Sequence, residues 1–264
     1  MNNIEHKLFI AAPTVINIQG RSRLIAKIQS EEWVRDLWYE VPECYGQYLC
    51  HERSDAFLVG VLSYAMRNHL DVECEAPVGE ELLYQLRTYF IPALARNAGD
   101  LYETKIIANV DTHPIENAKG VGTGISCGVD SLHAVALHAA CECPNQRLTH
   151  LVLNNVGSFW AHKEQRQWQI EHAKEFCNQF GFKLIVTDSN YADVIQLNHG
   201  LTHIFSSAFC ILALQKLWRV YYYGSTYDFS RFSLEGNDKH DPGGKPGYPH
   251  HHHGHFSLRL RLRG

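Results

Sequence analysis

The residues most capable of chemistry stand together in one short run, Gly124–Ser131, which reads Gly-Ile-Ser-Cys-Gly-Val-Asp-Ser. The run offers two hydroxyls, a thiol and a carboxylate between glycines. Apolar residues at helical spacing follow it, at Leu132, Val135, Ala136 and Ala139. This pattern predicts a strand, a tight loop and the start of a helix. Backbone N–H groups at a helix start lack acceptors within the helix, and the helix dipole is positive there, so the loop suits a phosphate.

Six residues of this run, Ser126–Ser131, resemble the Ser-Gly-Gly-x-Asp-Ser signature of the PP-loop ATP pyrophosphatase superfamily. The match holds at Ser126, Gly128, Asp130 and Ser131, and Cys127 stands where the family usually has its first glycine. These enzymes split ATP between the α and β phosphates and leave AMP on a substrate. The alternative for the run is an ordinary glycine turn between a strand and a helix.

The resemblance implies ATP and Mg²⁺ as cofactors and gives the loop residues their roles. Backbone N–H groups around Cys127–Ser131 would hold the phosphates, and the Ser126 and Ser131 hydroxyls would add donors. Asp130 would coordinate Mg²⁺, a hard cation that prefers carboxylate oxygen, or order the loop through backbone hydrogen bonds. Asp130 and Ser131 are the catalytic candidates. The expected ATP-binding residues are Ser126, Cys127, Gly128, Val129, Asp130, Ser131, Asn155, Val156, Gly157, Gly224 and Ser225.

Two further strand ends carry polar turns. Asn154–Gly157 follows an apolar strand, and in the resembled family this loop contacts the adenosine, with Gly157 where a close backbone approach is needed. Tyr223–Asp228 resembles the Gly-x-x-x-Asp turn of the cyano-deazaguanine (preQ0) synthase branch, an ATP-dependent nitrile-forming enzyme of the queuosine pathway. Simple strand-to-helix turns are the alternative for both. The resemblance covers residues 119–230.

The elements that must position these loops alternate between strand and helix. Strands are expected near 121–126, 148–153, 183–187 and 218–223, and helices at 131–141, 164–180 and 204–216, where Gly181 follows the second helix as its C′ residue. The alternation predicts an α/β fold, a parallel sheet with helices on both faces, and the resemblance makes it HUP/Rossmann-like. Ligands of such sheets bind at the carboxyl ends of the strands. We therefore expect the three loops on one edge.

The sequence also predicts a division of the chain. Residues 1–117 should form a smaller α+β domain of unknown role, and residues 118–238 the PP-loop ATP-binding domain. Residues 239–264 contain a histidine run and alternating basic and apolar residues, and we expect a disordered or non-native tail there, with a metal site as the alternative. In the first part, strands are expected at 7–18, 21–28, 33–41, 72–76 and 102–110, and helices at 56–68 and 80–96, the latter bent one turn before Pro92.

Composition narrows the class of partner. A formal net charge of -4 over 264 residues gives no broad cationic field, so nucleic acid is not an expected partner. The sequence shows neither a leader pattern nor an apolar stretch that could span a bilayer, and we expect a cytoplasmic protein without a membrane partner. The eight cysteines are scattered along the chain without a C-x-x-C pair, and we expect most of them to be small buried hydrophobic residues. A homo-oligomer stays open.

The resemblance to the PP-loop ATP pyrophosphatases implies an ATP-dependent adenylating enzyme that converts ATP to AMP and pyrophosphate. It would activate a carboxylate or similar oxygen of a small molecule or nucleobase for attack by an amine, ammonia or a sulfur nucleophile. The alternatives are a catalytically inactive ATP-binding or sensing module and a degenerate partner-binding scaffold. Cys127 is a further candidate because a helix N-terminus lowers the pKa of a thiol, although phosphate in the same loop would repel a thiolate.

Overall fold

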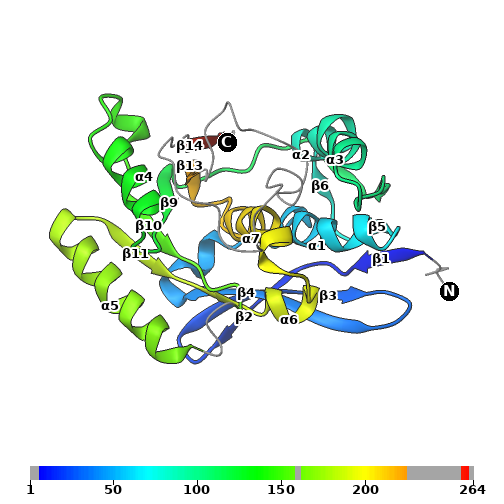
Figure 1. Cartoon of the computed structure of the whole chain (residues 1–264), viewed down its shortest axis with the longest axis horizontal. Helices are drawn as coiled ribbons and strands as arrows, with labels where there is room; N and C mark the ends of the chain where they lie inside the picture. Colours follow the sequence, from blue (N-terminus) through cyan, green and yellow to red (C-terminus); the bar gives the residue numbers. More distant parts are fainter. Residues whose placement is uncertain (1–5, 158–161, 225–256, 262–264) are drawn as a thin grey trace, which may run out of the picture.

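The computed structural model describes residues 6–157, 162–224 and 257–261, and it has a mixed α/β fold built on two main sheets (Figure 1). Helices pack between and beside these sheets. Among the described residues, every helix is too short or too polar to cross a bilayer. A third, two-stranded sheet pairs β6 (Val78–Gly79) with β8 (Val110–Asp111).

The first main sheet has the strand order β12-β4-β3-β1-β5-β7, with β2 paired to β3. Its strands are β1 (Lys7–Ile10), β2 (Thr14–Ile18), β3 (Arg21–Gln29), β4 (Val34–Pro42), β5 (Asp71–Cys74), β7 (Ile106–Ile107) and β12 (Asp188–Ser189). Every second residue of β3 is buried, because successive side chains of a strand point to opposite faces. The strand expected at 7–18 is divided before Pro13, which has no N–H for a sheet ladder. The strand expected at 102–110 is reduced to β7 and the first residue of β8.

The second main sheet has the order β11-β10-β9-β13-β14. Its strands are β9 (Gly120–Gly124), β10 (His150–Leu153), β11 (Lys183–Val186), β13 (Trp218–Gly224) and β14 (Ser257–Arg261). The first four are parallel, as expected, and β14 pairs antiparallel with β13. Along the chain the strands are added on one side of β9 as far as β11, and β13 then joins on the other side. The strand order therefore reverses between β9 and β13.

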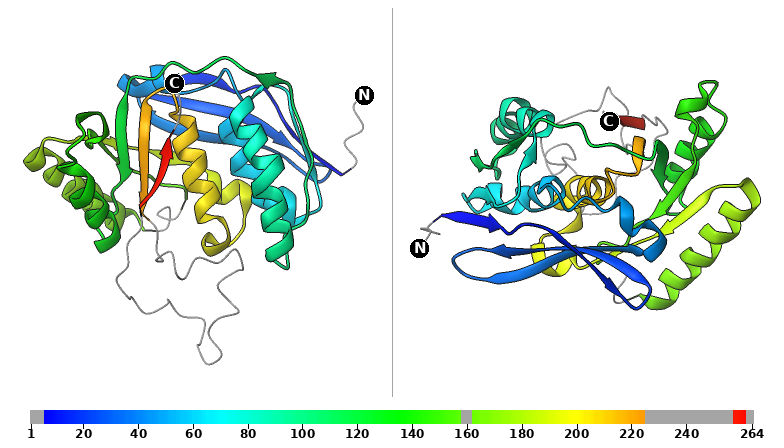
Figure 2. Two further views of the ribbon diagram at one scale, coloured as in Figure 1. Left: turned by 90° about the horizontal axis from the view of Figure 1, so that it is seen from above. Right: turned by 180° about the vertical axis from the view of Figure 1, so that it is seen from behind.

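Helices cover both faces of this parallel sheet. On one face, α4 (Val129–Ala139) and α5 (Lys163–Phe180) share an apolar cluster with β9, β10 and β13, and both helices lie on the left of Figure 1. On the other face lie α7 (His199–Ala213) and α1 (Asp55–Arg67), packed side by side (Figure 2). Gly181 ends α5 in the left-handed conformation with a φ of +75°, as predicted.

The helix expected at 80–96 is three segments: α2 (Glu80–Gln85), the π-helical η2 (Leu86–Phe90) and α3 (Ile91–Asn97). The wider π turn directly precedes Pro92, which has no N–H and whose ring clashes with the carbonyl four residues back. A π-helical segment therefore replaces regular α-helix in the turn before Pro92, where a bend was expected. The remaining short helices are η1 (Glu43–Tyr48), η3 (Pro144–Gln146) and α6 (Tyr191–Ile195).

The core continues across the expected boundary at residues 117 and 118. The ring of Phe209, on α7, lies 5.6 Å from that of Phe57, on α1, and 6.0 Å from that of Tyr39, on β4. In addition, β12 joins the first sheet beside β4. Within the tail expected at 239–264, β14 is a paired strand, and the other residues of that tail lie outside the described part of the chain.

Candidate functional site

The three predicted loops begin at the same edge of the parallel sheet, because β9, β10 and β13 run in the same direction. The N–H of Ile125 donates to the carbonyl of Val152 at 2.9 Å, so the chains leaving β9 and β10 are still paired there. A Cβ added to Gly224 would lie 3.8 Å from the carbonyl oxygen of Asp130, which brings the end of β13 beside the start of α4. Ser225 and the rest of its predicted turn lie outside the described residues.

The loop Ser126–Ser131 is closed by its own hydroxyls. Ser131 Oγ donates to the carbonyl of Gly128 at 2.9 Å, and Ser126 Oγ donates to Ser131 Oγ at 3.2 Å. The N–H of Gly128 donates to Ser126 Oγ at 3.4 Å. Gly128 is the N-cap residue of α4, and both Ser126 and Gly128 are exposed. The loop thus presents hydroxyls and the first N–H groups of an eleven-residue helix to the solvent side of the sheet edge.

Cys127 has a φ of +60°, in the left-handed region where a side chain is strained and glycine is not. This is the position at which the resembled signature has a glycine. The Cys127 side chain is half-buried against the cluster under α4 and α5, and this burial raises the pKa of its thiol. The lowered thiol pKa expected from the helix N-terminus is therefore wrong, since desolvation disfavours the thiolate. Cys127 is a strained packing residue of the loop.

The buried face of α4 differs from the expected one. Val135 is buried and Ala139 half-buried, as predicted, but Leu132 and Ala136 are exposed. Ala134 is buried instead, and the rings of His138 and Tyr222 stack at 3.5 Å. The packed face of α4 therefore includes the imidazole of His138, a residue that hydropathy scales do not class as apolar. Burial, and secondarily the nearby His133, lowers the pKa of His138, which favours the neutral form of the stacked imidazole.

The loop after β10 is shaped by internal contacts. Asn155 is 8% exposed; its Nδ2 donates to Asp188 Oδ1 at 3.0 Å, and its Oδ1 accepts from the N–H of Gly157 at 3.0 Å. Gly157 has a φ of +107°, and a Cβ there would lie 2.5 Å from the Cβ of Ala192. The carbonyl of Val156 accepts from the N–H of Ala192 at 2.9 Å. At Gly157 the close approach is made by Ala192 of α6.

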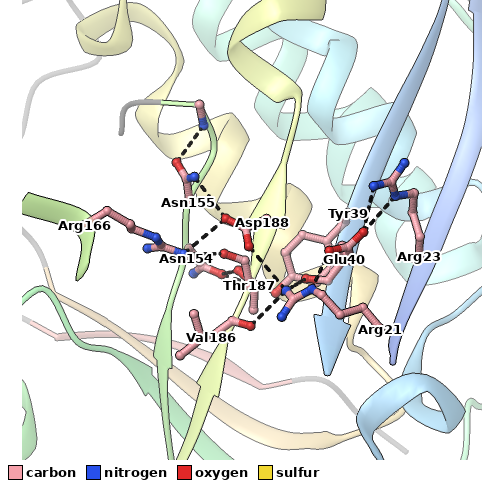
Figure 3. Close-up of polar contacts among 11 residues, drawn as sticks. Arg21, Arg23, Tyr39, Glu40, Asn154, Asn155, Arg166, Val186, Thr187 and Asp188 are labelled. Carbon is pink, nitrogen blue, oxygen red and sulfur yellow. Dashed lines mark hydrogen bonds and ion pairs between the residues drawn. The ribbon is translucent and has the colours of Figure 1, made fainter. Parts of the chain in front are cut away.

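A polar network missed by the sequence analysis lies beside this loop (Figure 3). Asn154 Oδ1 accepts from Thr187 Oγ1 at 2.8 Å and from the buried Tyr39 hydroxyl at 3.2 Å. Next to them, Asp188 accepts from Arg166 Nη2 at 3.3 Å and from Arg21 Nη2 at 3.4 Å. These residues come from β3, β4, α5, β12 and the ends of β10 and β11. No local pattern signals such a network, because its members are up to 167 residues apart.

The loop Ser126–Ser131 offers one carboxylate, Asp130, to a hard cation. Among the described residues, no three or more histidine, cysteine, aspartate or glutamate side chains are grouped so that they could hold a metal ion. Mg²⁺ that accompanies a nucleotide commonly takes one or two protein carboxylates, with phosphate oxygens and waters completing the shell. Asp130, half-buried in the first turn of α4, is the carboxylate of the loop Ser126–Ser131. The residues present therefore fit a cation bound together with phosphate.

Taken together, the loop Ser126–Ser131 offers hydroxyl and backbone donors, one carboxylate and the positive end of a helix dipole. Such a set suits an anion with several oxygens better than an apolar or cationic ligand. Comparisons with models of protein families, with curated proteins and with solved structures found no match to this chain.

Proposed function

We propose that the loop Ser126–Ser131 binds the phosphates of ATP and that the chain transfers AMP to an oxygen of an acceptor with release of pyrophosphate. The observation that carries the proposal is the place of the loop. It joins a parallel strand to a helix beside the reversal of strand order between β9 and β13, where ligands of such sheets bind. The left-handed Cys127, at the glycine position of the resembled signature, gives further support.

The same strand order supports the finer fold assignment. Numbered along the chain, the four parallel strands stand in the order third, second, first, fourth. This is the order at the centre of Rossmann-like sheets. Both faces are covered by helices, and the phosphate loop follows the first strand. We therefore assign the segment from β9 to β13 to the HUP/Rossmann-like arrangement of the PP-loop enzymes.

In this proposal the loop binds the β and γ phosphates. Backbone N–H groups of residues 127–131 donate to phosphate oxygens, and the Ser126 and Ser131 hydroxyls, which already face each other, turn to do the same. Asp130 is the ligand for Mg²⁺, which when bound neutralises charge on the phosphate oxygens. The loop Asn155–Gly157, with Val156 at its centre, forms the adenosine side of the site, and Gly224 closes the edge beside Asp130.

The reaction needs position and charge neutralisation more than it needs a protein nucleophile. An acceptor oxygen, most simply a carboxylate of a small molecule or nucleobase, attacks the α phosphorus in line. The new oxygen–phosphorus bond forms while the bond between the α phosphorus and the bridging oxygen breaks, and that electron pair leaves with pyrophosphate. The product is an adenylate, which an amine, ammonia or a sulfur nucleophile then attacks with AMP as the leaving group. A thiolate at Cys127 is not required.

The experiment is incubation with Mg²⁺ and ATP labelled at the α phosphate, with and without a pool of small carboxylates, followed by separation of AMP and adenylates. We expect labelled AMP from the unaltered chain and at least tenfold less from Asp130→Asn, since a lost ligand to the phosphate–metal cluster commonly costs more than 1.4 kcal/mol. Asp193→Asn, which changes an exposed carboxylate on α6, is the matched control. ATP binding without AMP would favour a sensing module. No ATP binding at all would overturn the proposal and favour a partner-binding scaffold.

A further inference from the structure

We propose that Asp188 is a positioning residue for the loop Asn155–Gly157, and that the amino-terminal sheet acts through Arg21 and Asp188 on the adenosine side of the site. The inference rests on the proposed function, because it concerns how that site is held. It goes beyond it by giving the first half of the chain a role in nucleotide recognition. The residues concerned are drawn in Figure 3.

Asp188 stands where three parts of the structure meet. Its Oδ1 accepts from Asn155 Nδ2 at 3.0 Å and from Arg166 Nη2 at 3.3 Å, and its Oδ2 accepts from Arg21 Nη2 at 3.4 Å. One carboxylate therefore ties the loop after β10 to α5 and to β3. Its side chain is 36% exposed, so it lies at the open margin of the sheet edge and not in the core.

The amino-terminal side of this contact is held in place independently. Glu40, whose side chain is only 10% exposed, forms ion pairs with both Arg21 and Arg23, and Arg21 Nη2 also donates to the carbonyl of Val186 at 3.2 Å. Backbone pairing of β12 with β4 places Asp188 directly opposite Glu40. Arg21 is thus fixed by a nearly buried carboxylate before it reaches Asp188. A guanidinium fixed in this way loses little side-chain entropy on making the contact.

From Asp188 the chain of contacts leads into the loop. Asn155 connects Asp188 to the backbone of the loop, because the Oδ1 atom of its side-chain amide accepts from the N–H of Gly157 at 3.0 Å. By contrast, the loop Ser126–Ser131 is closed by its own hydroxyls, whose hydrogen bonds described above stay within the loop. The two halves of the site therefore have separate supports. Loss of the Asp188 contact should loosen the adenosine side and leave the phosphate side unchanged.

This separation gives a test by two ligands. Inorganic tripolyphosphate presents the phosphate chain without adenosine, so the ratio of its affinity to that of ATP reports on the adenosine side alone. In Asp188→Asn, an NH₂ group replaces one of the two carboxylate oxygens of the side chain. That NH₂ group either faces a donor of Asn155, Arg166 or Arg21, or one of these donors loses its acceptor. We expect the ATP dissociation constant to rise about tenfold, the equivalent of one charge-assisted hydrogen bond, while that of tripolyphosphate changes less than twofold.

Arg21→Gln is the second variant, because Arg21 reaches the loop only through Asp188 in the contacts described above. It should shift the ratio of the tripolyphosphate and ATP affinities in the same direction, by about threefold. If Asp188→Asn does not fold, this variant alone tests the inference. Glu73→Gln is the control. It breaks the 3.0 Å ion pair of Glu73 with Lys7, a partly exposed pair in the same sheet, and should leave the ratio unchanged.

Calorimetric titration of each folded variant with each ligand in Mg²⁺ separates the outcomes. A selective loss of ATP affinity in Asp188→Asn or Arg21→Gln supports the inference. An unchanged ratio, or an equal loss for both ligands, would overturn the inference and leave the proposed function standing. If the unaltered chain binds neither ligand, the proposed function fails and this inference fails with it.

Discussion

Gly157 and Ala192 are so close that a Cβ on Gly157 would lie 2.5 Å from the Cβ of Ala192. The backbone of Gly157 also has a φ of +107°, which L side chains rarely adopt. The loop after β10 is therefore docked onto α6, the helix that follows β12. This contact sets the height of the loop above the sheet edge, and it does so through backbone geometry that a glycine alone allows.

Gly157→Ala should therefore destabilise the protein by about 2–4 kcal/mol, as the sum of backbone strain and an overpacked contact. Urea unfolding followed by circular dichroism measures this. The matched control is Gly181→Ala, because Gly181 has a φ of +75° but open space around its Cβ position. That variant should lose only the backbone strain, about 1 kcal/mol. Equal losses in the two variants would show that the contact with Ala192 is unimportant.

Cys127 offers a test of the left-handed turn in the loop Ser126–Ser131. Cys127→Gly relieves the strain, whereas Cys127→Val puts a β-branched side chain where it is least tolerated. We expect Cys127→Gly to keep or tighten tripolyphosphate binding, and Cys127→Val to weaken it at least tenfold and to lower stability by about 1–2 kcal/mol. If the thiol were instead a nucleophile, Cys127→Gly would abolish AMP formation while binding persisted.

Much of the parallel sheet could be predicted from the sequence because its elements carry long, regular patterns. The four-residue β10 is buried throughout, and its apolar run is typical of a strand covered on both faces. The two-residue β12 and the five-residue α6 were missed, because neither is long enough to show a period. The boundary predicted near residue 117 came from the polar stretch with Pro114 and Gly120, and it could not include the pairing of β12 with β4, which links residues on either side of it.

For the site, the sequence could predict which loops meet but not what holds them. Parallel strands must end at the same edge, so the convergence of the ends of β9, β10 and β13 needed only the strand assignment. The contacts of Asp188 with Arg21 and Asn155 depend on tertiary structure and leave no local signal. Cys127 was misjudged for a related reason. Its burial under α4, which raises the thiol pKa, is a tertiary contact that the neighbouring residues do not signal.

The stability of the protein should depend on pH through His150, at the start of β10. Burial, and secondarily the charge of Lys183, lowers the pKa of His150 to about 4, from an ordinary value near 6.5. As the pH falls through this interval, the unfolded chain binds a proton that the folded chain does not. His150 therefore contributes stability that is present above pH 6.5 and is lost toward pH 4, at roughly 1 kcal/mol per pH unit.

Urea unfolding at several pH values between 4.5 and 7 measures this slope. In His150→Gln the slope should be flatter by about one proton, although the variant is less stable at pH 7, because the ring packs edge-on against Trp218 at 5.8 Å. A slope that persists in His150→Gln would assign the proton to another group.

The central claim, that the loop Ser126–Ser131 receives the phosphates of ATP, is tested most directly by hydrogen exchange of its backbone amides. With ATP and Mg²⁺, the N–H groups of residues 127–131 become donors to phosphate oxygens, so their exchange should slow at least tenfold. AMP, which lacks the β and γ phosphates, should leave most of this exchange unchanged. If saturating ATP and AMP left the exchange of these amides equally fast, the phosphates would not lie in this loop and the proposed function would be wrong.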